Sequence, residues 1–515
     1  MKRFLSAVLL AALLALPTTA ATSLTTSNLP DGGVTIAVDG DTCTVSGAIR
    51  HTNMDAVWIH VGEENKVLSA QSGQTFQYTV HLQGDGDREV TIYTRQSGAE
   101  MFWSYLWRTV KLCKTADGWQ IEDTDAYDHN RRIWETTWVN PGDCLGDVDP
   151  TVAAKAWEIV GTETDDYARL QKLYGWVAEN LYYGTGTDGS LPLTAAEVLA
   201  NGYTVCEGYT NLLVALCRAV GIPCMQVHTW SAGDGSDGYV SSEDARALLA
   251  TEDKIGIINH AHAAAWVNGR WIHMDPTWDS ANRYVNGQKT KESASGWMYF
   301  DATLDYLSRS HLILQLPCAA EAADTPSDWA MAEVRTALEK ELIPLSQQER
   351  YTEQITRGDF CTLLMTMLVS KTNSASIEAL LTAKGVTTDP ATFTDVAEAD
   401  STAILAANAL GIVNGRGNGI FDPQSPITRQ EAAVMLMRAA QVLGIEMGDE
   451  PMRFADMGDA ADWAAIGILY TSSLVSESGK AVMGGVSDTK FSPLTGYTRE
   501  QAMLTMVRLW GVRGE

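Results

Sequence analysis

The strongest constraint on the fold is a two-residue turn, Asn268-Gly269, between two short and mainly apolar segments, residues 260–267 and 270–275. Asn-Gly is strongly preferred in tight β-hairpins, because both central positions of such a turn need a positive φ. The two segments are therefore predicted to pair as antiparallel strands. Because strand side chains alternate between the two faces, this pairing also decides which side chains share a face.

Two histidines and an aspartate lie on one face of this predicted hairpin. His262 falls opposite Asp275, and His260 lies one diagonal step away. The hairpin therefore brings an imidazole to a carboxylate. Spacing alone does not choose between the two histidines.

A cysteine, Cys206, stands about fifty residues before the hairpin, at the start of a helical pattern. Apolar residues follow it at spacings of one, three and four, and a Gly-Ile-Pro stop signal ends the pattern at residues 221–223. The first turn of a helix has free backbone N–H groups and favours negative charge, so it suits a thiolate, the nucleophilic form of cysteine. A thiol, an imidazole and a carboxylate are the parts of a nucleophilic cysteine site.

The residues around these positions resemble the transglutaminase-like superfamily, in particular its bacterial cysteine-peptidase-like members. The matching pieces are Cys206-Glu207-Gly208-Tyr209, Val220-Gly221-Ile222-Pro223, the turn glycine Gly269 with Trp271, and Asp275-Pro276-Thr277-Trp278-Asp279. The resemblance covers roughly residues 149–311. It implies a papain-like or transglutaminase-like α+β catalytic domain over residues 149–317.

The resemblance also assigns roles. Cys206 is the expected nucleophile, His260 the general base and acid, and Asp275 the residue that orients the imidazole. His262 stands where the family usually has tryptophan, and Ala263 where it often has asparagine. The expected chemistry is acyl transfer from an amide through a thioester, on a protein or peptide substrate. If water accepts the acyl group from the thioester, the protein is a peptidase or amidase. If a lysine amine accepts it, the protein is a cross-linking transglutaminase.

A metal site is the competing use of these residue types. His260, His262 and His273 could be drawn as ligands, but the region lacks both a C-x-x-C pair and a second carboxylate cluster. We therefore expect neither a metal nor a cofactor.

The N-terminus predicts export. A basic start, an apolar run over residues 4–16 and small residues near Ala20 and Ala21 are typical of a signal peptide, residues 1–21. About 13 apolar residues fall short of the roughly 20 that a spanning helix needs. No membrane attachment is expected once this peptide is removed.

The net charge of the chain argues against two classes of partner. The chain has 64 acidic and 37 Lys or Arg residues, a net charge of −27, which disfavours nucleic acid and anionic lipid as ligands. The 515 residues of the chain are enough for three or more domains.

The eight cysteines of the chain do not form a dense disulfide scaffold. A Cys43–Cys113 bridge is one possibility, and Cys217 and Cys224 are expected to be buried as small apolar residues.

Residues 22–138 show short alternating apolar segments separated by turn signals. This pattern predicts an immunoglobulin-like β-sandwich. Its aromatic residues are expected in the core or at a domain contact rather than on a ligand platform.

The C-terminal third contains a repeat. Thr-Arg pairs recur at residues 356–357, 428–429 and 498–499. The surrounding residues resemble three S-layer homology modules, over residues 323–370, 391–444 and 452–513, which look like small helical units in a three-part bundle. The first module diverges most, because it lacks the Gly-rich turn and the Phe-x-Pro piece of the second.

In that family such modules help bind pyruvylated secondary cell-wall polysaccharide. The residues that would do so here are Arg357, Arg429 and Arg499 with Thr428 and Thr498. An arginine fork and a helix N-terminus both suit a carboxylate. The alternative is that these residues only cap and pack the helices.

The sequence thus predicts a multidomain α+β protein with an N-terminal β-sandwich, a catalytic core and an α-helical repeat bundle. It would be a secreted cysteine enzyme held at the cell wall or S-layer surface. The rival interpretation is a catalytically silent, wall-bound adhesion or scaffold protein.

Overall fold

The computed structural model describes residues 23–29, 33–49, 53–71, 73–104, 110–122, 124–232, 240–291, 297–319 and 325–512. The expected signal peptide, residues 1–21, lies outside the described residues. Within the described ranges, no helix is both long and apolar enough to cross a membrane.

Residues 23–121 form two antiparallel sheets, and each alternating segment of the sequence there is a strand. Their apolar faces share one buried cluster, because alternate residues of strands such as β2 (Val34–Asp39) and the first part of β9 (Val110–Thr115) point inward. The first sheet has the order β1 (Ser23–Thr25), β2 (Val34–Asp39), β3 (Thr42–Ala48), β6 (Thr75–His81). The second has the order β10 (Gly118–Ile121), β9 (Val110–Thr115), β7 (Arg88–Gln96), β4 (Met54–Val61), β5 (Glu64–Ser69), with β8 (Trp103–Ser104) beside β7.

The same alternation separates Cys43 from Cys113. Cys43 points from β3 into the apolar cluster, whereas Cys113 of β9 is half-buried and its thiol donates to the Gln120 carbonyl. Both thiols are free, so the bridge considered from the sequence does not form.

A five-stranded antiparallel sheet forms the middle of the chain. Its order is β18 (Phe300–Ala302), β15 (Arg270–Met274), β14 (His260–Val267), β13 (Cys224–Ser231), β19 (His311–Gln315). Asn268 and Gly269 both have positive φ, and β14 pairs with β15 from Val267↔Arg270 to Ala263↔Met274. The predicted hairpin and its register are therefore confirmed.

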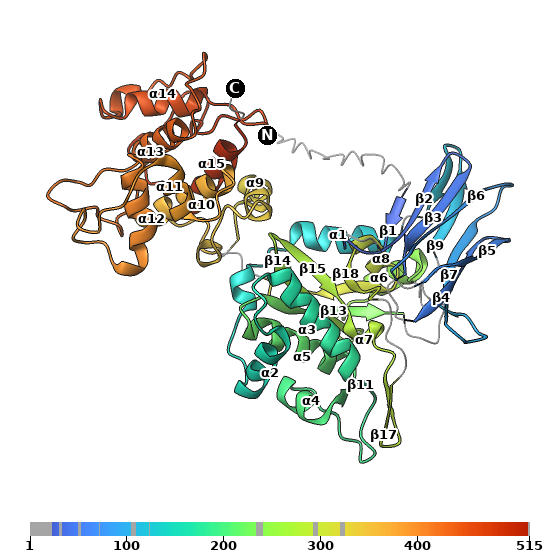
Figure 1. The fold of residues 1–515 in the computed structure, drawn as a ribbon. Coiled ribbons are helices and arrows are strands. Elements are labelled where there is room, and N and C mark those ends of the chain that lie inside the picture. The colour runs from blue at the N-terminus through green and yellow to red at the C-terminus, as the bar shows by residue number, and fades with distance from the viewer. Residues whose placement is uncertain are drawn as a thin grey trace, which may run out of the picture.

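Helices cover both faces of this sheet (Figure 1). On one face α2 (Pro150–Val160), α3 (Asp166–Asn180) and α5 (Cys206–Ala219) pack against Ala263 and Ala265, and on the other α1 (Asp125–Thr136) packs near Ala264. Burial on both faces explains why β14 reads as a run of alanines rather than as an alternating strand.

Smaller elements complete this part of the chain. They are η1 (Pro141–Cys144), α4 (Ala195–Asn201), α6 (Ser242–Ala250), α7 (Pro276–Asp279), α8 (Leu304–Ser308) and a small sheet of β12 (Tyr203–Thr204), β11 (Tyr182–Tyr183), β16 (Arg283–Val285) and β17 (Gln288–Thr290).

The C-terminal part is helical, and its three repeats meet in a closed ring of backbone hydrogen bonds. Ile355 N–H donates to Tyr497 O at 2.8 Å, Tyr497 N–H to Ile427 O at 3.0 Å, and Ile427 N–H to Ile355 O at 3.1 Å. A helix begins two residues after each member of the ring: α10 (Arg357–Lys371), α13 (Arg429–Val442) and α15 (Arg499–Trp510). The other elements are α9 (Asp328–Glu339), η3 (Leu345–Gln347), α11 (Ile377–Lys384), α12 (Glu398–Ala409), η4 (Met457–Asp459) and α14 (Ala465–Ser473).

The helical part touches the middle sheet through α9. A Cβ added to Gly269 would lie 2.6 Å from the carbonyl oxygen of Leu338 at the end of α9, so the β14–β15 turn sits directly on that helix. Arg335 of α9 donates to the carbonyl oxygens of Trp134 and Glu135 in α1, each at 2.9 Å. The first repeat is therefore docked on the hairpin that carries His260 and Asp275.

Candidate active site

Asp275 is the centre of the site, and its place at a helix start explains how it is held. It is the N-cap of α7, and its Oδ1 accepts hydrogen bonds from the backbone N–H groups of Thr277 at 2.9 Å and Trp278 at 3.3 Å. An Asp-Pro sequence suits this position, because proline as the first helical residue costs no backbone hydrogen bond. The cap fixes the carboxylate and leaves Oδ2 for other partners.

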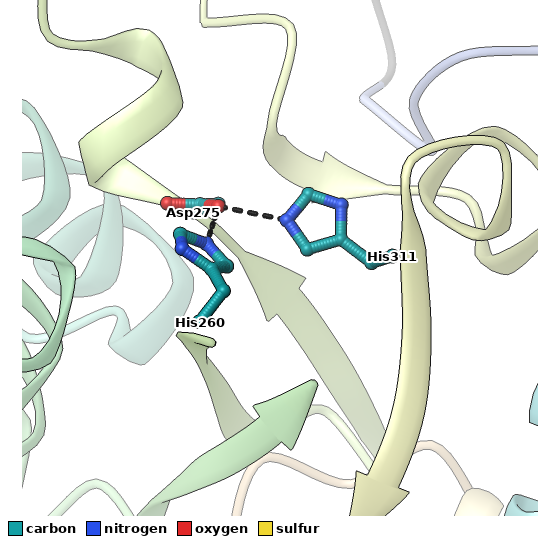
Figure 2. A group of neighbouring side chains, drawn as sticks. All are labelled: His260, Asp275 and His311. Atoms are coloured by element: carbon teal, nitrogen blue, oxygen red, sulfur yellow. Dashed lines mark hydrogen bonds and ion pairs between the residues drawn. The ribbon is translucent and has the colours of Figure 1, made fainter. Parts of the chain in front are cut away.

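Two histidines share Oδ2 of Asp275 (Figure 2). Nε2 of His260 on β14 lies 2.7 Å from it, and Nε2 of His311 on β19 lies 3.0 Å from it. Nδ1 of His311 is 2.8 Å from the hydroxyl of Ser310. His260 is 6% exposed, and Asp275 and His311 are fully buried. With Nε2 of His260 directed at the carboxylate, Nδ1 remains for a further group.

Pattern reasoning did not identify His311 as a partner of Asp275. β19 reaches the site by pairing with β13, which lies about eighty residues earlier in the chain. A pairing that distant leaves no local signal of the kind that Asn268-Gly269 provides.

Cys206 is the first residue of α5, as predicted, and the helix start is held against β14. The Thr210 hydroxyl lies 3.0 Å from the Cys206 carbonyl oxygen and 2.9 Å from the Ala261 carbonyl oxygen. It therefore bridges the first turn of α5 to the strand residue next to His260. The Cys206 thiol is close enough to His260 to contribute to the raised pKa of that imidazole.

The start of α5 lacks a side-chain cap. Val205 occupies the N-cap position, and its side chain has no polar atom that could accept from the first N–H groups. Those N–H groups lie beside the thiol, where an oxyanion would form during attack on a carbonyl.

Gly208 allows another segment to cross this helix start. A Cβ at residue 208 would lie 2.0 Å from Oγ1 of Thr204, and that hydroxyl donates to the Pro192 carbonyl at 2.5 Å. The small residue two positions after the cysteine thus lets β12 pass close to α5.

The charges of His260 and Asp275 depend on each other. Burial opposes protonation of His260, but the Asp275 carboxylate and then the Cys206 thiol raise the pKa of this imidazole to about 10. Burial likewise opposes ionisation of Asp275, but His260 and His311 hold the pKa of that carboxyl well below its usual range. At neutral pH the pair is an imidazolium and a carboxylate.

His262 and His273 are buried near this pair, and their pKa values shift in the direction opposite to that of His260. Neither ring nitrogen of His262 has a hydrogen-bond partner among the described residues, and Nδ1 of His273 has none there either. Burial, together with the neighbouring histidines, lowers the pKa of His262 well below its ordinary value. Burial lowers the pKa of His273 to about 4. His262 is thus a neutral core residue beside the site.

The metal-ligand set drawn from the sequence does not form. The structure instead brings together His260, Asp275 and His311, whose ligand atoms all lie within 4.8 Å of one another. Both imidazoles already bond to one carboxylate oxygen, and the other oxygen accepts the α7 amides. A cation would fit only after both imidazole–carboxylate hydrogen bonds were broken.

The predicted wall-binding residues lie in the C-terminal ring. Thr356, Thr428 and Thr498 are N-caps of their helices. The three arginines are buried and bond to the neighbouring repeat: Arg357 to Phe421 O and Glu431, Arg429 to Phe491 O and Gly484 O, and Arg499 to Asp359. The three guanidinium groups therefore join each repeat to its neighbour in the structure.

Comparison with known families identifies two domains. The transglutaminase-like superfamily matches residues 153–276, a segment that includes Cys206, His260 and Asp275. The S-layer homology domain matches residues 392–433, within the second predicted module. The chain therefore contains a transglutaminase-like domain and an S-layer homology domain, and the latter indicates association with the cell surface.

Individual relatives are distant. The chain is 24% identical to the human (Homo sapiens) kyphoscoliosis peptidase over 199 residues, 38% of this chain and 26% of that protein. It is 28% identical to an endoglucanase of Bacillus sp. (strain KSM-635) over 193 residues, 36% of this chain and 18% of that protein. The periplasmic domain of TgpA from Pseudomonas aeruginosa is 13% identical, with 47% of this chain and 72% of that chain covered and a TM-score of 0.20. The chain spans about a quarter or less of the two curated relatives.

His262 should make the protein sensitive to acid. Because its pKa in the folded state is below the ordinary 6.5, the unfolded chain binds more protons as pH falls below 6.5, and stability is lost in that direction. His262→Leu should weaken this dependence, by up to about 1.4 kcal/mol per pH unit for one proton. Calorimetric unfolding between pH 5 and 8 measures the effect. His273, which the variant retains, should leave a smaller dependence of the same sign, and an unchanged dependence in the variant would contradict this role for His262.

Proposed function

We propose that this chain, with its transglutaminase-like and S-layer homology domains, is an exported cysteine enzyme that acts on amides of proteins or peptides at the cell wall. One observation carries the proposal: the His260 imidazole bonds to the buried Asp275 carboxylate, and the Cys206 thiol at the start of α5 is near enough to that imidazole to raise its pKa. A thiol, an imidazole and a carboxylate in this order can activate a cysteine nucleophile.

In the proposed reaction the Cys206 sulfur attacks the amide carbonyl carbon. The N–H groups at the start of α5 stabilise the negative charge that develops on the carbonyl oxygen. The His260 imidazolium gives its proton to the leaving amine, which leaves a thioester on Cys206. An acceptor then attacks the thioester, His260 takes the acceptor's proton, and the thiolate–imidazolium pair is restored. Asp275, held by α7 and His311, keeps the imidazole oriented throughout.

Water is the acceptor that we favour, which makes the enzyme a peptidase or amidase. The name of the human relative, a peptidase, supports this choice. A lysine amine would make it a cross-linking transglutaminase, and the same three residues serve either acceptor. The alternative of a different class is a catalytically silent scaffold protein. Burying a charged imidazole costs free energy, and a scaffold would have no need of one beside a thiol.

We further propose that residues 22–138 are an immunoglobulin-like β-sandwich and that residues 323–370, 391–444 and 452–513 are three S-layer homology modules. The cluster shared by the two N-terminal sheets supports the first assignment. The ring that joins all three repeats, including the divergent first one, supports the second. The modules would hold secondary cell-wall polysaccharide at helix starts ordered by Arg357, Arg429 and Arg499.

Alkylation of Cys206 by iodoacetamide tests the nucleophile and its base. Cys206 should react faster than Cys113, a half-buried thiol of the N-terminal sheets that serves as internal standard. His260→Ala should slow the alkylation of Cys206 about tenfold or more, because the imidazole that stabilises the thiolate is lost. His262→Ala should change the rate little. Labelling no faster than that of Cys113, or an effect of His262→Ala but not of His260→Ala, would contradict the assignment.

Incubation with surface proteins tests the acceptor. The wild-type protein should produce new peptide termini detectable by mass spectrometry, and Cys206→Ala should produce none, because no thioester can form. A primary amine should be added in a parallel sample. Amine adducts without new termini would show a transferase instead of a peptidase. If neither product formed with any surface protein, the result would favour the catalytically silent scaffold.

Sedimentation with isolated cell walls tests the anchor. The full chain should pellet with walls, and removal of their acidic polysaccharide should release it. Arg429→Ala should weaken retention roughly tenfold, because a buried fork that orders a helix start is lost, and Arg357→Ala should weaken it less. Arg438→Ala, on the same helix but away from its start, is the control. Retention on stripped peptidoglycan would contradict the polysaccharide assignment.

A further inference from the structure

A chain of buried hydrogen bonds reaches Asp275 from the start of β19. Nε2 of His311 lies 3.0 Å from Oδ2 of Asp275 (Figure 2), and Nδ1 of the same ring lies 2.8 Å from the Ser310 hydroxyl. The Ser310 hydroxyl in turn lies 3.3 Å from the hydroxyl of Tyr299. All four residues are fully buried. A polar chain inside a core is stable only when its members are bonded to one another, as they are here.

The backbone that carries His311 is held on two sides. β19 is an edge strand of the five-stranded sheet, and it pairs there with β13. On its other side the buried amide of Asn130, in α1, donates to the His311 carbonyl oxygen at 2.7 Å and accepts from the Ile313 N–H at 2.7 Å. Strand pairing and this amide together fix the place from which the imidazole reaches Asp275.

The surroundings of His311 determine which of its nitrogens carries a proton. A bare Nε2 would face a carboxylate oxygen, so Nε2 carries a proton and donates it to Asp275. A second proton, on Nδ1, would place another positive charge beside His260, whose ring centroid is 5.1 Å away and which uses the same carboxylate oxygen. His311 is therefore a neutral imidazole, and its Nδ1 is an acceptor.

The Ser310 hydroxyl is placed to fix this tautomer. Nδ1 of His311 is its nearer acceptor, at 2.8 Å, because the Leu307 carbonyl oxygen is 3.4 Å away. When Ser310 donates to Nδ1, its oxygen can accept from the Tyr299 hydroxyl. The hydrogen bonds then all run in one direction and end on the carboxylate.

We propose that His311 is a positioning residue that donates to Asp275 and keeps this carboxylate ionised, while Ser310 fixes the tautomer that can donate. The inference rests on the proposed function, because the charge of Asp275 matters for chemistry only if His260 acts on Cys206. The thiolate, the imidazolium and the carboxylate together carry one net negative charge in a largely buried site. A hydrogen-bond donor stabilises this more negative state over the state that has gained a proton. His311 thus supports the thiolate without touching the substrate.

The ionisable groups that face His311 are Asp275 at the start of α7, His260 and His262 on β14, His273 on β15 and Tyr299 before β18. Burial lowers the pKa of His262 and of His273, so both are neutral near pH 7. On the helices that pack against β19, Asp305 of α8 is paired with Arg309, and His129 of α1 bonds to the Ile313 carbonyl oxygen. The charges that His311 meets are therefore those of Asp275 and His260.

The pH dependence of Cys206 alkylation by iodoacetamide, measured on the full chain, tests the proposal. In the wild type the rate should fall below a midpoint pH at which the cluster gains a proton. His311→Leu should raise that midpoint by about one pH unit, because the lost donor stabilised the more negative state. His311→Gln keeps an N–H donor and should reverse most of the shift. His262→Leu removes a buried imidazole that does not reach the carboxylate, and should leave the midpoint unchanged.

A merely structural role for His311 would give a different result. Lost packing would lower the unfolding temperature or the fraction of reactive protein but leave the midpoint at the wild-type value, and that outcome in His311→Leu overturns the proposal. If His311→Leu does not fold, Ser310→Ala decides, because it should raise the midpoint by a smaller amount and an unchanged midpoint overturns the proposal. Wild-type Cys206 that reacts no faster than Cys113 would instead contradict the proposed function itself.

Discussion

The site depends on one buried carboxylate that has to satisfy four donors. Two backbone amides of α7 bind one oxygen of Asp275, and two imidazoles bind the other. A charge with no exposed surface is tolerated only when it is bonded in this way. The requirement ties together β14, β15, β19 and α7, so the same interaction that charges His260 also fixes the arrangement of the sheet. The Thr210 bridge then holds the start of α5, which carries Cys206, against the strand that carries His260.

Local chemistry made much of this arrangement predictable. Asn268-Gly269 specified the hairpin and its register, and helical spacing placed Cys206 at a helix start. Choosing His260 over His262 needed the family resemblance, because both histidines share a face of the strand. The distinction that the structure adds is physical: His260 reaches Asp275, while His262 packs against the rings of His273 and His311 without reaching the carboxylate.

The features missed by pattern reasoning all involve contacts between distant segments. His311 comes from a strand paired across the sheet. The acceptors of Arg357, Arg429 and Arg499 come from the next repeat. A Thr-Arg pair at a helix start looks the same in sequence whether its fork faces a ligand or a neighbouring carbonyl. Likewise, alternation shows that Cys43 points inward but does not by itself show that Cys113 lies on the outer side of the opposite sheet.

The contact between Gly269 and α9 connects the helical repeats mechanically to the candidate site. The end of α9 rests on the turn that joins β14 and β15. Those two strands carry His260 and lead into Asp275. Any displacement of α9 would therefore be passed to this turn and to the strands that position the imidazole–carboxylate pair.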